Sequence, residues 1–81
     1  MRDVMYFEND NMLFKTIGKK IKYFRKEANL TQYQLAEKAR ISLSYLSKIE
    51  ANNCDKRVSI PVLNKIANSL NVDIIEFFKE G

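Results

Sequence analysis

The chain has 81 residues, enough for one compact domain and too few for two, and 46% of them are hydrophobic, which allows a packed core. It has no histidine and one cysteine, Cys54, so the composition excludes a disulfide framework and deprives a zinc site of its usual ligands. The formal net charge is +4, and residues 15–26 contain six basic side chains and no acidic one, which indicates an anionic partner.

No apolar stretch approaches the roughly 20 residues that cross a bilayer, and the N-terminus lacks the basic-then-apolar pattern of a secretion signal. We therefore expect a soluble cytoplasmic protein without a membrane contact. Residues 1–14 show no clear period, and we expect an N-terminal arm there, whose last residues join the first helix. Three roles of the arm stay open: disorder, part of a dimer interface, or a contact for a protein partner. Residues 15–81 form the predicted domain.

The first predicted helix starts at Thr16, where the apolar residues begin to recur at spacings of four and three. Its inward stripe consists of Ile17, Ile21, Phe24 and Ala28. Asn29 is a suitable end. Three lysines lie mostly off this stripe, and we expect them on an ordinary solvated face: Lys19, Lys20 and Lys22.

The second predicted helix begins after Thr31, which forms a capping box with Gln34 three residues later. Its narrow apolar face consists of Leu35, Ala36 and Ala39. Arg40 and Ile41 then break the pattern. Ser42 caps a third helix. The inward residues of this third helix are Leu46 and Ile49.

The second half of the chain predicts two more helices after a polar loop at residues 51–58. Ser59 starts the fourth helix, because the proline that follows at position 61 is tolerated in a first turn. Its inward stripe consists of Leu63, Ile66, Ala67 and Leu70. Asn71 suits a left-handed end. Asp73 with Glu76 starts a short last helix through Phe78. The predicted fold is all-α with five helices.

The segment from Gln32 to Glu50 carries the functional signal, because two short helices joined by a tight turn form a helix-turn-helix. The side chains that must point inward to lock the two helices are Leu35, Ala39, Ile41, Leu46 and Ile49. The side chains then left facing outward are Ser42, Leu43, Ser44, Ser47 and Lys48. The second helix of such a motif can enter the major groove of DNA.

Residues 17–78, roughly three quarters of the chain, resemble the Cro/CI-type (XRE) family of helix-turn-helix regulators, which includes phage repressors and SinR-type proteins. The resemblance rests on the motifs LTQYQLAEKA, SYLSKIE and LNKIANSLNVDIIEFF. It implies a lambda-repressor-like DNA-binding domain. One departure is Arg40, which stands where the family usually has glycine. In a left-handed conformation arginine costs about 1 kcal/mol, which a phosphate contact would offset.

The resemblance also implies roles for individual residues toward DNA. Gln32 contacts a phosphate at a helix N-terminus, while Ser44 and Lys48 read base edges. Leu43 lacks a hydrogen-bonding group and suits a thymine methyl. The complete expected DNA-binding set is Gln32, Ser42, Leu43, Ser44, Tyr45, Ser47, Lys48, Asn52, Asn53, Lys56 and Arg57. Within it, Tyr45, Ser47 and the four residues of the loop are expected at the DNA backbone.

Several of these side chains have a second interpretation that the sequence leaves open. Leu43 is either a base contact or an exposed apolar residue, and Tyr45 either reaches a phosphate or packs its ring on the domain. Lys48 is either a base reader or a solvated lysine. Cys54, in the polar loop, is either a free thiol or a redox switch. The loop is also longer than in the shortest family members.

Two further expectations concern the frame of the domain. In the family, an arginine of the first helix pairs with the glutamate that closes the recognition helix, so Arg25 and Glu50 should form a partly buried bidentate pair. Ile75 stands where an amphipathic helix would show a polar residue, which indicates a dimer interface at Ile75 and Phe78.

The sequence therefore predicts a transcriptional regulator, a repressor or controller, that binds double-stranded inverted-repeat operator DNA as a homodimer. The alternative is an antitoxin-like or anti-repressor module that binds proteins and touches DNA only incidentally. We expect no cofactor, no metal and no enzymatic activity, since the chain shows no nucleophile–base pair and no phosphate-cradling glycine loop.

Overall fold

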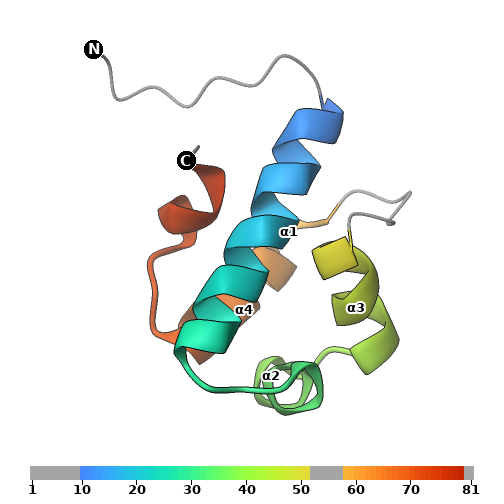
Figure 1. Ribbon diagram of the computed structural model, residues 1–81, viewed down its shortest axis with the longest axis vertical. Coiled ribbons are helices and arrows are strands. Elements are labelled where there is room, and N and C mark those ends of the chain that lie inside the picture. Colours follow the sequence, from blue (N-terminus) through green and yellow to red (C-terminus); the bar gives the residue numbers. More distant parts are fainter. Residues whose placement is uncertain (1–9, 52–57, 80–81) are drawn as a thin grey trace.

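The computed structural model describes residues 10–51 and 58–79, and within them the fold is entirely helical (Figure 1). Its elements are α1 (Asp10–Glu27), α2 (Gln32–Ala39), α3 (Leu43–Ala51), α4 (Ile60–Leu70) and the short 3-10 helix η1 (Ile74–Phe78). The all-helical prediction is confirmed for this part of the chain. No helix in it is long and apolar enough to cross a membrane.

The predicted short last helix is present, and it is a 3-10 helix rather than an α-helix. Asp73 caps it, since its carboxylate accepts a hydrogen bond of 3.1 Å from the N–H of Ile75. The N–H of Glu76 reaches back three residues to the carbonyl of Asp73 at 2.9 Å, which is 3-10 bonding. Lys79 is already extended. Five residues are too few for a stable α-helix, and the tighter form suits such short pieces.

The first helix differs from its prediction at both ends. It begins at Asp10 rather than near Thr16, so residues 10–14 of the expected arm belong to α1, and residues 1–9 lie outside the described part. Leu13 and Phe14 pack against the core and extend the inward stripe by one turn. At the other end Ala28 is exposed, which corrects its assignment to the stripe.

Side-chain caps begin the middle helices, as the sequence predicts. Thr31 Oγ1 accepts from the N–H of Gln34 at 3.0 Å, and the Gln34 side chain accepts from the N–H of Thr31 at 2.8 Å. Ser59 Oγ accepts from the N–H of Val62 at 3.2 Å at the start of α4. Left-handed residues follow three of the helices: Asn29, Arg40 and Asn71, with φ of 59°, 59° and 60°. Because these signals act over a few residues, they are legible in the sequence.

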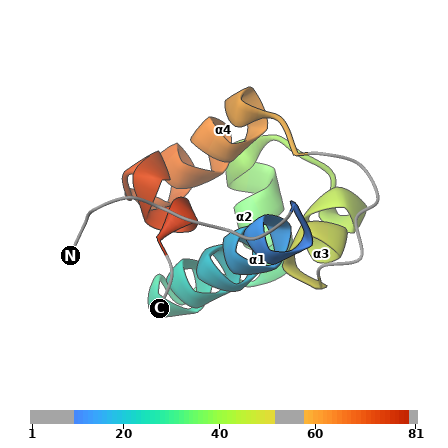
Figure 2. The same ribbon diagram turned by 90° about the horizontal axis from the view of Figure 1, so that it is seen from above.

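α1 is the axis of the domain, and it separates two other elements. α3 packs along one side of it and η1 along the other, and both views place α3 and η1 on opposite sides of α1 (Figures 1 and 2). α2 packs against both α3 and α4. The buried hydrophobic residues come from all five elements: Ile17, Ile21, Leu35, Ala36, Ala39, Leu46, Ile49, Leu63, Ile66, Ala67, Leu70 and Phe77. This single core fixes the orientation of α3.

Candidate nucleic-acid interface

The turn between α2 and α3 is tight because Arg40 adopts the left-handed conformation, with φ 59° and ψ 45°. The N–H of Arg40 bonds to the carbonyl of Glu37 at 3.2 Å, and the N–H of Ile41 reaches the carbonyl of Ala36 at 3.0 Å. This is the Schellman pattern, which normally favours glycine at the left-handed position. Ile41 packs its side chain against the core and anchors the turn.

α3 has one buried flank and one free flank. Leu46 and Ile49 are buried, as predicted. Ser42 caps the helix, since its Oγ accepts from the N–H of Tyr45 at 3.0 Å. The exposed residues of this segment are Ser42, Leu43, Ser44, Lys48 and Ala51. The first turns of α2 and α3 contain no acidic residue, so the partial positive charge of both N-termini is free to attract an anion.

Tyr45 lies between these flanks. Its ring is partly buried and packs against the core, which was one of the two open interpretations. A phosphate contact by its hydroxyl stays a prediction. Leu43, by contrast, exposes 43% of its surface at the first position of α3. An apolar side chain this open is available for a methyl contact.

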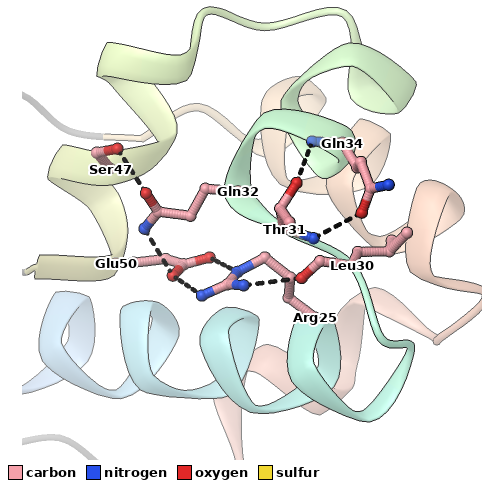
Figure 3. A network of polar contacts seen from close by, with 7 residues as sticks. All are labelled: Arg25, Leu30, Thr31, Gln32, Gln34, Ser47 and Glu50. Atoms are coloured by element: carbon pink, nitrogen blue, oxygen red, sulfur yellow. Dashed lines mark hydrogen bonds and ion pairs between the residues drawn. The ribbon is translucent and has the colours of Figure 1, made fainter.

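A network of polar contacts joins the start of α2 to the end of α3 (Figure 3). The hydroxyl of Ser47 donates to Gln32 Oε1 at 2.8 Å, and Gln32 Nε2 donates to Glu50 Oε1 at 3.0 Å. The hydroxyl of Ser47 thus donates its hydrogen bond within the protein, whereas the sequence analysis expected it to face the DNA backbone. Gln32 Nε2 carries two N–H donors, so Gln32 retains a second N–H beside the positive N-terminus of α2.

The expected pair between Arg25 and Glu50 is present in this network. Arg25 Nε donates to Glu50 Oε2 at 2.8 Å and Arg25 Nη2 donates to Glu50 Oε1 at 3.0 Å, so the pair is bidentate. Arg25 Nη1 also donates to the carbonyl of Leu30 at 2.8 Å. Only 10% of the Arg25 side chain and 3% of the Glu50 side chain are exposed. The pair therefore joins α1, the link before α2, and the end of α3.

Gly18 is a residue that the sequence reasoning missed. It lies in the middle of α1 and is buried against the last turn of α3. A Cβ built on it would collide with the carbonyl oxygen of Ile49 and lie 3.5 Å from the Cα of Glu50. The sequence contains one clue to this role. Glycine stands inside an otherwise strong helix, where alanine is preferred by about 1 kcal/mol.

Other expected residues lie elsewhere. Asn52, Asn53, Lys56 and Arg57 of the loop, and Cys54 with its open redox role, are outside the described residues. Ile75 exposes 41% of its surface on η1, while Phe78 is partly buried against the core. Within residues 10–51 and 58–79, no group of three or more histidine, cysteine or acidic side chains is placed to hold a metal.

Comparisons with known proteins agree on the kind of domain. A family profile described as helix-turn-helix matches residues 21–77. The immunity repressor protein of Bacillus phage phi105 is 44% identical over 59 residues, which are 73% of this chain and 40% of the phage protein. The transcriptional regulator SinR of Bacillus subtilis is 43% identical over 58 residues, which are 72% of this chain and 51% of SinR. The chain thus matches about half the length of these relatives.

Two structures of SinR are among the solved structures that share the fold. The N-terminal DNA-binding domain of SinR from Bacillus subtilis superposes with a TM-score of 0.75 at 39% identity, covering 82% of this chain and 94% of that domain. SinR, described as the master regulator for biofilm formation and solved in complex with DNA, gives a TM-score of 0.73 at 40% identity. That match covers 78% of this chain and 98% of the other.

Proposed function

Since the chain belongs to the helix-turn-helix family of Cro/CI-type regulators, we propose that it is a repressor that binds operator DNA through α3. One observation carries the proposal. The apolar flank of α3 closes the core, while Leu43, Ser44 and Lys48 on the other flank are exposed. A short helix fixed in this way, with its polar flank open, fits the major groove.

The contacts divide into two kinds. The N-termini of α2 and α3, together with the second N–H of Gln32, suit phosphates, which position a protein on the duplex without reading its sequence. The exposed Ser44 and Lys48 suit base edges, since lysine binds the O6 and N7 atoms of guanine and serine accepts several partners. Leu43 suits a thymine methyl. Sequence preference would therefore depend on three side chains of α3.

A homodimer is the second part of the proposal. Ile75 is exposed beside the partly buried Phe78, on the side of α1 that faces away from α3. A two-fold contact there would cover the apolar surface, and it leaves both copies of α3 free. Two recognition helices about one DNA turn apart predict an inverted-repeat operator.

The test is duplex binding by the purified protein. Sequences selected from random duplexes should share an inverted repeat, and they should bind at least about 1,000-fold more tightly than random duplex at physiological salt. Affinity for random duplex should fall steeply between 50 and 200 mM salt as counterions are released. A protein-binding module with incidental DNA contact would instead select no sequence. That result, with a flat salt response, would reject the proposal.

A further inference from the structure

We propose that Gly18 is a positioning residue for α3, and that its missing side chain sets how accurately α3 reads a DNA sequence. The inference rests on the proposed function and adds to it a residue remote from DNA. Gly18 of α1 contacts the last turn of α3. The contact lies on the side of α3 that faces the core.

The contact is between backbones, and this makes it strict. The atoms nearest to a Cβ at Gly18 would be the carbonyl oxygen and carbon of Ile49 and the Cα of Glu50. A clash with a flexible side chain is relieved by a change of rotamer, whereas a clash with a carbonyl is relieved only by moving one helix away from the other. Any residue other than glycine therefore shifts α3 relative to α1.

A second contact from α1 lies two turns further along the same face. Arg25 holds Glu50 through two hydrogen bonds, and Gly18 meets the residue before it, Ile49. α1 thus fixes two consecutive residues at the end of α3, while Ser42 and Ile41 fix its beginning. A methyl at position 18 pushes the end of the helix outward against a beginning that stays in place.

The expected consequence falls on base reading. Lys48 directly precedes Ile49, so a displacement of that turn moves its ammonium relative to the groove. Hydrogen bonds to base edges tolerate displacements of about 0.5 Å, and phosphates accept a cation from many directions. Loss of one such base contact corresponds to roughly a 5- to 100-fold loss of discrimination.

Helix propensity acts in the opposite direction, which makes Gly18→Ala informative. Alanine is the better helix former, so propensity alone predicts a protein that is at least as stable and binds as before. Asn68→Ala is the matched control. Asn68 is exposed on α4, away from α3, and the change also favours helix. It should leave binding unchanged.

The experiment measures the dissociation constants of wild type, Gly18→Ala and Asn68→Ala for a selected operator duplex and for a random duplex. The readout is their ratio, because partial unfolding weakens both affinities by the same factor and cancels in it. We expect the ratio of Gly18→Ala to fall roughly 5- to 100-fold, with the random-duplex affinity nearly unchanged after correction for the folded fraction. Equal ratios for all three proteins would overturn the inference.

Two further outcomes remain decisive. If Gly18→Ala does not fold, the measurement is repeated in trimethylamine N-oxide, which favours the compact state. A variant that stays unfolded there, or that folds and keeps the wild-type ratio, shows that the glycine serves folding and not reading. If the wild type itself selects no duplex, the proposed function fails, and the role of Gly18 in reading DNA fails with it.

Discussion

The two ends of α3 are held by different means. Its beginning is fixed by neighbours in the chain, since Arg40 makes the left-handed turn, Ile41 anchors in the core and Ser42 caps the helix. Its end is fixed by residues far away in the sequence, namely Gly18, Arg25 and Gln32. The local contacts set where the helix starts, and the distant contacts, together with the core, set the direction in which it points.

The largest effect is expected at the distant end, on breaking the buried pair. Glu50→Gln leaves the Arg25 guanidinium buried without a counter-charge, so we expect the free energy of unfolding to fall by roughly 3–5 kcal/mol. Urea denaturation measures the loss. Glu76→Gln is the matched control, because the pair between Glu76 and Lys79 is much more exposed and should contribute about 0–1 kcal/mol. Similar losses for both variants would contradict the account.

Disruption of the beginning of α3 should lower the free energy of unfolding by a smaller amount. Ser42→Ala removes the oxygen that accepts from the N–H of Tyr45, and we expect a loss of about 1 kcal/mol. Ser44→Ala, two residues later on the exposed face, should change the unfolding free energy by less than about 0.5 kcal/mol. Equal melting temperatures for the two variants would show that the Ser42 cap does not stabilise the domain.

The turn offers a smaller change with the opposite sign. Arg40→Gly relieves a left-handed side chain and should stabilise the domain by up to about 1 kcal/mol. Asn71, which is also left-handed, is the comparison, since asparagine tolerates this region better and Asn71→Gly should gain less. If Arg40 also contacts a phosphate, the more stable variant should bind random duplex more weakly. Destabilisation by Arg40→Gly would contradict this interpretation of the turn.

The same contrast explains what the sequence could predict. The capping box at Thr31, the caps at Ser42 and Ser59 and the left-handed end at Asn71 involve residues within a few positions of one another. Such signals are fixed by chemistry that is local in the chain. The element order followed from them together with the apolar periodicity, whereas the left-handed position at Arg40 was raised only by the family resemblance.

The remaining features depend on contacts between distant residues. Periodicity placed Ala28 inside, whereas the buried side chain near the end of α1 is Arg25, because Glu50 on α3 compensates its charge. The Arg25–Glu50 pair itself was expected from family resemblance and not from spacing. Ser47 was expected at the DNA backbone, and no pattern in α3 alone indicates that its hydroxyl donates a hydrogen bond to Gln32.

The most direct test of the account is to repeat the selection of binding sites from random duplexes with Lys48→Ala and Gln32→Ala. The predicted result is a Lys48→Ala protein whose preference relaxes at one base position in each half-site, and a Gln32→Ala protein that selects the wild-type sequence with weaker affinity throughout. If Lys48→Ala selects the wild-type sequence with undiminished preference at every position, α3 does not read DNA as proposed.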